Sequence, residues 1–177
     1  SNHGLPVGGF MELDVKLEVE GYDPQKVREA IARILESNKL LSMASIKDGE
    51  SYINTAYFCF DRLLNILTLN DPSSQHVANI AKNPSVALAI YDSSQPIDSK
   101  RQGLQIFGNC TRAEGELAEA GLQLYFDRFP AFKQWLQSSG KEISEAKKMV
   151  YVTRPTWLKL YDEPDFGHVF IPVKIEQ

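Results

Sequence analysis

Residues 40–92 constrain the fold of this chain most, because they alternate short apolar runs with strong turn signals. Residues 40–46 are followed by Asp48-Gly49, a pair typical of hairpin turns because Gly tolerates positive φ. Residues 52–60 then alternate between two faces, as a pleated strand requires, and residues 63–69 form a third apolar run. This order predicts a hairpin extended by a third strand, with both faces of the middle strand partly buried.

A helix start follows the third run. Asp71 is the capping candidate, Pro72 occupies the favoured first position, and Asn83-Pro84 ends a helix expected over residues 72–82. The first turn of such a helix presents unpaired N–H groups at the positive end of the macrodipole, which suits a phosphomonoester. Capping alone also explains Ser, Asp and Pro at this place, so both interpretations stay open.

The same signals place the remaining segments. Asp23-Pro24 opens a helix whose apolar residues recur at i, i+4, i+7 and i+8 from Val27. A second such helix spans residues 115–129, and the aromatic residues beyond Pro130 form a helical insert, either a lid over a flat ligand or an anchor onto the sheet. Further strands are expected at residues 86–91, 102–113, 149–153, 157–161 and 169–175, the last at an edge and the two before it joined through Arg154-Pro155-Thr156.

The composition fits one globular domain. The chain has 177 residues, of which 43% are hydrophobic and 24% charged, enough for a core of ordinary size. We expect a single domain over residues 11–177. Residues 1–10 are expected to be a flexible N-terminus, which we interpret as partly a remnant of cloning.

Charge and cysteine usage exclude several function classes. The net charge of −4 argues against nucleic-acid partners, which require a basic face. No apolar run is long enough for a membrane span and no signal peptide is recognisable, so we expect a cytoplasmic protein without a membrane partner. Cys59 and Cys110 lack a C-x-x-C pattern and are expected to be buried free thiols, and the three histidines lie too far apart to predict a metal site.

The order of these motifs resembles the flavin-binding split-barrel family typified by pyridoxamine 5'-phosphate oxidase. The matching pieces are Asp48-Gly49, residues 52–58, Leu69-Asn70, residues 74–76, Asn79-Ile80, Asn83-Pro84 and residues 86–90. A poorly characterised branch of that superfamily shares a strand like residues 103–108 before an acidic helix, a segment like Arg128-Phe129-Pro130, and a late pair like Phe166-Gly167. The resemblance implies a mainly β fold with flanking helices, namely a six- to seven-stranded antiparallel split β-barrel with a helical insert.

The resemblance also implies an FMN cofactor bound at a homodimer interface. The implied cofactor-binding residues are Asn54, Thr55, Ala56 and Tyr57 along the isoalloxazine ring, Leu69 and Asn70 near the ring and ribityl chain, Ser74, Gln75 and His76 at the phosphate, and Gln105, reaching the flavin of a partner subunit. A polar residue on a half-exposed strand explains Gln105 equally well. The family typically has a Ser-Arg-Lys run at the phosphate, so Gln75 and His76 replace two cations and weaken the expected phosphate binding.

The resemblance therefore predicts an FMN-binding oxidoreductase, with substrate and catalytic residues unassigned. No basic cluster near the C-terminus suits a second phosphate, so oxidation of pyridoxamine phosphate itself is not expected. One alternative is haem binding or degradation, with His76 or His168 as axial ligand. Another is a dimeric binding protein without a cofactor.

Overall fold

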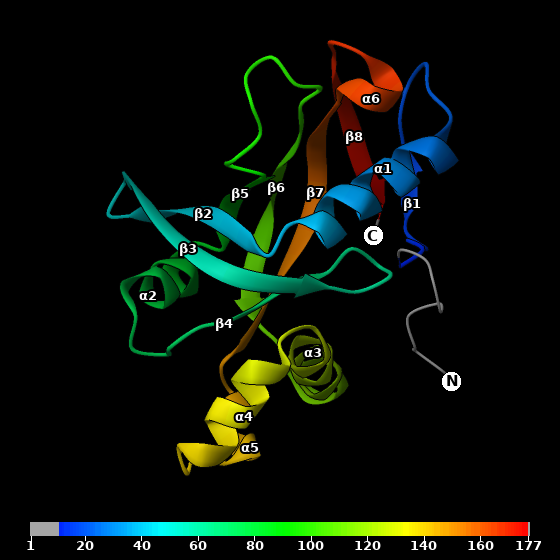
Figure 1. The fold of residues 1–177 in the computed structure, drawn as a ribbon. Coiled ribbons are helices and arrows are strands. Elements are labelled where there is room, and N and C mark those ends of the chain that lie inside the picture. Colours follow the sequence, from blue (N-terminus) through cyan, green and yellow to red (C-terminus); the bar gives the residue numbers. More distant parts are fainter. Residues whose placement is uncertain (1–10, 177) are drawn as a thin grey trace.

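Residues 11–176 are described by a computed structural model, in which strands dominate and helices flank them (Figure 1). The strands are β1 Lys16–Glu18, β2 Leu40–Lys47, β3 Glu50–Phe60, β4 Ile66–Leu69, β5 Ser85–Tyr91, β6 Gln102–Arg112, β7 Val150–Asp162 and β8 Phe170–Glu176. The helices are α1 Pro24–Ser37, α2 Gln75–Lys82, α3 Gly115–Arg128, α4 Pro130–Ser138, α5 Ile143–Lys147 and α6 Glu163–Phe166. The N-terminus predicted to be flexible, residues 1–10, lies outside the described residues.

The strands form one antiparallel sheet that closes into a barrel. Their order is β1-β8-β7-β4-β3-β2-β5-β6, and a further pairing of β6 with β7 closes six of them. The remaining two, β8 and β1, extend the sheet from β7 (Figure 1). The predicted split barrel with a helical insert is confirmed. The six strands of the closed barrel agree with the predicted six to seven, and β8 and β1 lie outside the closure. The predicted edge position of residues 169–175 is wrong, because Lys16–Glu18 pairs with β8.

A β-bulge keeps β7 continuous where the sequence predicted two strands. Gly108 pairs with Pro155 and Phe107 with Trp157, so Thr156 is an extra residue in β7. The bulge changes which side chains face the barrel, because each extra residue shifts the alternation by one. Tyr151 packs in the barrel core before the bulge and Leu158 after it. The prediction of a break at residues 154–156 is therefore wrong, although the irregularity lies there.

The hairpin and third strand are confirmed with shifted bounds. Asp48 and Gly49 both have positive φ, 50° and 81°, as the predicted tight turn requires. The third strand begins only at Ile66, because Leu64 adopts a φ of 63° in the turn before it. In β3, the face that carries Ile53 is exposed up to Tyr57, so the prediction that both faces are partly buried is wrong for most of the strand.

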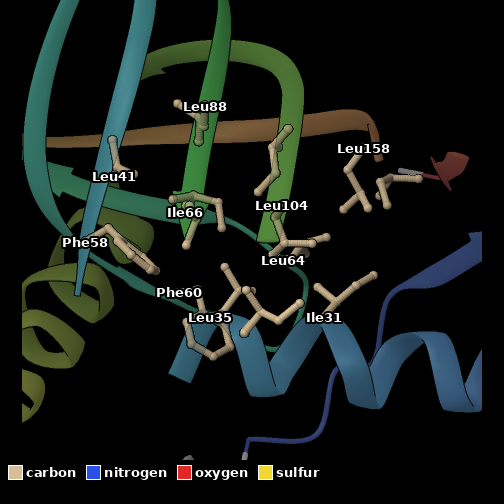
Figure 2. Close-up of a cluster of buried hydrophobic side chains, with 14 of the residues drawn as sticks. Ile31, Leu35, Leu41, Phe58, Phe60, Leu64, Ile66, Leu88, Leu104 and Leu158 are labelled. Atoms are coloured by element: carbon tan, nitrogen blue, oxygen red, sulfur yellow. The ribbon is translucent and has the colours of Figure 1, made fainter. Parts of the chain in front are cut away.

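Helix α1 covers one opening of the barrel. Asp23 caps it by accepting a hydrogen bond of 3.0 Å from the Gln25 N–H. Its predicted apolar stripe is buried, and Figure 2 shows Ile31 and Leu35 pointing toward side chains of the strands. The labelled strand residues of this barrel core include Leu41, Phe58, Ile66, Leu88, Leu104 and Leu158.

Arg128, at the C-terminal end of α3, connects three segments that are distant in sequence. Its guanidinium donates to the Phe58 carbonyl in β3 at 3.0 Å and to the Leu35 carbonyl at the end of α1 at 2.9 Å. It also donates to the carbonyls of Glu36, at 3.2 Å, and Asn38. The last turn of a helix has unpaired carbonyls, and Arg128 satisfies those of α1. The arginine of the Arg-Phe-Pro segment therefore has a structural role, because it holds α1, α3 and β3 together.

The helical insert forms a second, smaller core against the outside of β4 and β7. Tyr125 and Phe126 are buried in it together with Leu136 of α4. These side chains anchor the insert, as one of the two interpretations of its aromatic residues predicted. Trp135, in contrast, is 55% exposed. Among the described residues no helix is both long and apolar enough to cross a membrane.

Candidate functional site

The site implied by the sequence lies where the barrel is split. Strand β4 pairs with β3 only along Phe58–Phe60, so the rest of that edge of β3 has no neighbouring strand among the described residues. Thr55 and Tyr57 lie on this open part of the edge. Strand β4 ends at Leu69, and Asn70 follows it. Helix α2 begins a few residues later and lies next to β2 and β3 (Figure 1).

The four predicted strand residues divide between two faces. The side chains of Thr55 and Tyr57 are exposed on the outer face, whereas Asn54 and Ala56 point inward and are partly buried. Because neighbouring residues of a strand alternate, only one of these pairs can contact the same side of a flat ring. The structure places Thr55 and Tyr57 on the accessible side.

Asn54 is a buried polar residue whose amide lacks a partner. Both its Nδ2 and its Oδ1 are inaccessible to solvent and form no hydrogen bond within the described part of the chain. Buried amides are normally paired, and an unpaired one costs roughly 1–3 kcal/mol. The amide therefore lies on the interior side of β3 with its hydrogen-bonding capacity unused by the described residues.

Asn70 and His76 form a small hydrogen-bond network beside the open edge. Asn70 Nδ2 donates to Thr68 Oγ1 at 2.8 Å, which leaves Asn70 Oδ1 as an acceptor. His76 Nε2 lies 3.0 Å from that oxygen and 3.2 Å from Ser74 Oγ. Burial lowers the pKa of His76, and the nearby Asp71 carboxylate only partly offsets this. The imidazole is therefore mainly neutral at pH 7 and supplies little positive charge.

Helix α2 begins at Gln75, later than predicted, and Ser74 rather than Asp71 is its cap. Ser74 Oγ accepts from the Val77 N–H at 3.4 Å. Asp71 forms its own turn instead, in which its carboxylate accepts from the Ser73 N–H at 2.9 Å and from the Ser73 hydroxyl at 2.8 Å. These bonds hold the pKa of Asp71 below its ordinary value. A permanent negative charge thus lies at the start of α2.

The first turn of α2 still presents donors. The N–H groups of Gln75 and His76 have no acceptor within residues 11–176, and they lie at the positive end of the macrodipole. The Gln75 side chain bonds to Asn79 at 2.8 Å and so is directed along the helix. Residues 70–77 contain no Lys or Arg. An anion at this place would be bound by N–H groups alone.

Gln105 lies on the same outer face but far from the open edge. It pairs with Ala89, which pairs with Ser42, which pairs with Thr55, so these four residues form one row across β6, β5, β2 and β3. Three strand spacings separate Gln105 from Thr55, about 14 Å. Within one chain they cannot contact the same ring, so Gln105 could serve only the site of a second subunit.

Two features of the site were missed in the sequence. Tyr57 packs edge-on against Phe129, with ring centroids 5.5 Å apart, so the helical insert borders the open edge. The Arg-Phe-Pro segment was the available signal. At the far end of the outer face, His168 Nδ1 lies 2.9 Å from the Tyr161 hydroxyl, which also donates to Glu163 at 2.8 Å. These three residues lie within eight positions of one another in the sequence, around α6.

The described cysteines and histidines offer no metal site. Cys59 and Cys110 are free and buried as predicted, and burial raises the pKa of Cys59 to about 12 and that of Cys110 to about 11. Residues 11–176 contain no group of three His, Cys, Asp or Glu side chains arranged to hold a metal ion.

Several solved structures are similar to this fold. A haem-binding protein from Mycobacterium smegmatis is 19% identical with a TM-score of 0.59, and the match covers 72% of this chain but only 50% of that protein. HutZ, the haem storage protein from Vibrio cholerae, is 18% identical with a TM-score of 0.58, covering 71% of this chain and 87% of HutZ. A NimC/NimA family protein from Clostridium acetobutylicum is 11% identical with a TM-score of 0.58, covering 79% and 86%.

These similarities establish the shared fold. Comparison with curated proteins finds no match. The family model described as pyridoxamine 5'-phosphate oxidase matches residues 27–159, from α1 into the second half of β7. That range contains the open edge of β3, the start of α2 and the row of paired residues that runs from Thr55 to Gln105. The chain therefore belongs to the pyridoxamine 5'-phosphate oxidase family.

Proposed function

We propose that this chain is an FMN-binding oxidoreductase that acts as a homodimer. The observation that carries the proposal is the open edge of β3 at Thr55 and Tyr57, bordered by the end of β4 and by α2. The Phe58 N–H bonds to Lys39 on the β2 side. Alternate residues of a strand direct their backbone groups to opposite edges, so those of Thr55 and Tyr57 point to the open edge. They suit the N–H and C=O groups of a flavin ring.

The residues present fit the ring of the cofactor better than its phosphate. Tyr57 offers an aromatic surface supported by Phe129, and the unpaired Asn54 amide supports a polar ligand nearby. At the phosphate end, two N–H groups of α2 are opposed by the Asp71 carboxylate, without a compensating Lys or Arg in residues 70–77. We expect flavin binding to be weaker than a permanent cation at this place would give.

Bound flavin would supply hydride or electron transfer, so the protein need not provide an acid or base for the redox step. The chain's own contribution is binding and orientation. The backbone of Thr55 and Tyr57 would fix the ring by hydrogen bonds, the Tyr57 and Phe129 rings would exclude water from one side, and the first turn of α2 would hold the phosphate.

Changing the charge at the start of α2 tests whether the phosphate of the cofactor binds there. Asp71→Asn should tighten FMN binding several-fold, because it removes a negative charge while keeping the side-chain oxygen that accepts from Ser73. His76→Lys should tighten it about tenfold by adding a permanent cation. Quenching of flavin fluorescence measures both dissociation constants.

Asp92 provides a matched control for Asp71. Its carboxylate accepts from the Ser94 N–H at 2.9 Å and from the Ser94 hydroxyl at 2.7 Å, the same turn in a loop far from α2 in sequence. Asp92→Asn should leave the affinity unchanged. Equal affinities for FMN in wild type, Asp71→Asn and His76→Lys would remove α2 from the phosphate site.

The homodimer is proposed from the outer face of the sheet. The small residues Ser42, Ala44, Ala87 and Ala89 form its centre, and large exposed side chains surround them. These are Leu40, Ile46, Ile53, Tyr57, Tyr91, Trp157 and Phe170. An exposed apolar surface of this extent is typical of an interface, and a two-fold arrangement would let Gln105 approach the partner's open edge.

A charge in that face should separate the subunits. Ile53 is 69% exposed on β3, and Ile53→Glu should shift the protein from dimer to monomer at micromolar concentration because it buries an unpaired carboxylate in the interface. Leu63→Glu is the control, since Leu63 is 60% exposed in the turn after β3. Light scattering measures the mass. A wild-type monomer, or an Ile53→Glu dimer, contradicts the proposed interface.

A second candidate function, haem binding, is favoured by the position of His168. Its imidazole is exposed beside Tyr161, whose ring lies 4.7 Å from that of the exposed Phe170. An exposed imidazole can act as an axial haem ligand once its Nε2 leaves the Glu163 carboxylate, 3.5 Å away, and two proteins of similar fold are haem proteins. The absorbance spectrum after titration with FMN and with haem distinguishes the candidates: flavin binding, a Soret band, or neither for a cofactor-free binding protein.

A further inference from the structure

A cleft outside the proposed flavin site lies between α2 and the neighbouring ends of β6 and β7. Its volume is about 660 Å³, within the range of about 300–1,000 Å³ usual for small-molecule sites. One wall is apolar and consists of Val77 and Ile80 of α2 with Leu117 of α3. The proposed flavin site uses the N–H groups at the start of α2 and the open edge of β3, whereas this cleft is lined by α2 side chains and by the ends of β6 and β7.

Two guanidinium groups line the polar wall. Arg154 donates from one terminal nitrogen to Thr111 Oγ1 at 3.1 Å, which orients the group and leaves its other N–H donors without a partner in the described chain. Arg112 lies 3.8 Å from Glu114, at the outer limit of an ion pair between two exposed side chains. A planar guanidinium with unused donors matches the two oxygens of a carboxylate.

Tyr151 adds a neutral donor to the lining of the cleft. It is Arg112's partner across β6 and β7, its side chain is buried, and its hydroxyl has no hydrogen-bond partner among the described residues. Burial raises the pKa of this phenol although Arg112 opposes the shift. The hydroxyl thus stays protonated at neutral pH and can donate to an anion without adding negative charge.

We infer that this cleft binds a small organic monoanion, a carboxylate attached to an apolar body, with Arg154 and Arg112 at the carboxylate and Val77 and Ile80 against the body. Two guanidinium groups and the Glu114 carboxylate leave one net positive charge, which matches one negative charge better than the two of a phosphate monoester. The apolar wall explains why an organic body, rather than an inorganic ion, fills the remaining volume.

Three probes that share one ring test the inference by fluorine NMR: fluorobenzoate, fluorobenzyl alcohol and fluorophenyl phosphate. Fluorobenzoate should bind to the full chain, and the neutral alcohol and the phosphate should each bind at least about tenfold more weakly. Arg154→Gln should weaken fluorobenzoate about tenfold and Tyr151→Phe by a smaller factor. Arg62→Gln, on the turn after β3, removes an exposed guanidinium outside the cleft and should change nothing.

The outcomes decide the inference independently of the flavin proposal. Equal binding of the alcohol would overturn the role of the arginines, and tighter binding of the phosphate would overturn the monoanion. Absence of fluorobenzoate binding by wild type, or unchanged binding by a folded Arg154→Gln variant, would overturn the site. Saturating FMN should not displace fluorobenzoate; displacement would mean that the cleft belongs to the cofactor site.

Discussion

Arg128→Ala is expected to lower the free energy of unfolding by about 3 kcal/mol, because it leaves several backbone carbonyls without their donor. The guanidinium bonds to Phe58 in β3 and to three carbonyls at the end of α1. It also lies over the Phe58 ring, 4.8 Å from its centroid. Losing these contacts loosens α1, α3 and β3 together, so the cost exceeds that of a single hydrogen bond. Urea denaturation followed by circular dichroism measures it.

Two variants test whether the several N–H donors of the Arg128 guanidinium account for this loss of stability. Arg128→Lys keeps the charge but cannot bond to the carbonyls of both β3 and the end of α1 at once, so it should recover only a small part of the loss. Arg28→Ala removes a guanidinium of α1 whose described bond is a 3.3 Å contact with Gln25, and should change stability by less than about 0.5 kcal/mol. An Arg128→Ala protein as stable as Arg28→Ala would contradict the structural role given to the Arg-Phe-Pro segment.

Gly108→Ala is expected to destabilise the protein by about 3 kcal/mol or to prevent folding, because the added carbon has no room. A Cβ at this position would lie 2.2 Å from the Arg154 carbonyl oxygen and 2.9 Å from the Pro155 Cα. These are backbone atoms of the bulge in β7, so they cannot move aside without breaking the pairing of β6 with β7. The same denaturation experiment measures the loss.

Gly103 is the control on the same strand. A Cβ there would meet Tyr91 Cβ at 3.4 Å and the Ile90 carbonyl oxygen at 3.5 Å, which are ordinary contacts. Gly103→Ala should therefore cost little. If both variants were equally stable, β6 and β7 would not approach each other at the bulge as closely as described.

Local signals in the sequence were sufficient for most of the fold. The Asp48-Gly49 turn, the cap at Asp23 and the apolar stripe of α1 were predicted because each depends on residues a few positions apart. The predicted start of α2 was wrong, because Asp71 forms a turn with Ser73 while Ser74 caps the helix. Several residues there satisfy the same local preference, and only the path of the chain chooses among them.

The candidate site was predicted less completely than the fold. Sequence reasoning placed residues 54–57 on one strand and divided them between two faces, and the structure shows that the face of Thr55 and Tyr57 is the accessible one. It did not find the unpaired amide of Asn54, the contact between Tyr57 and Phe129, or the cleft lined by Arg112 and Arg154. Each of these depends on segments that are distant in the chain.

The sequence by itself determined which segments become strands and helices, the order in which they follow, and the family to which that order belongs, because periodicity and turn residues act over a few positions. Only the tertiary structure decided which side chains of β3 and β7 face the barrel and which groups converge at its open edge. Strand pairing and the bulge at Thr156 set those relations, since one extra residue reverses every side chain beyond it. That dependence on distant partners is absent from any local pattern.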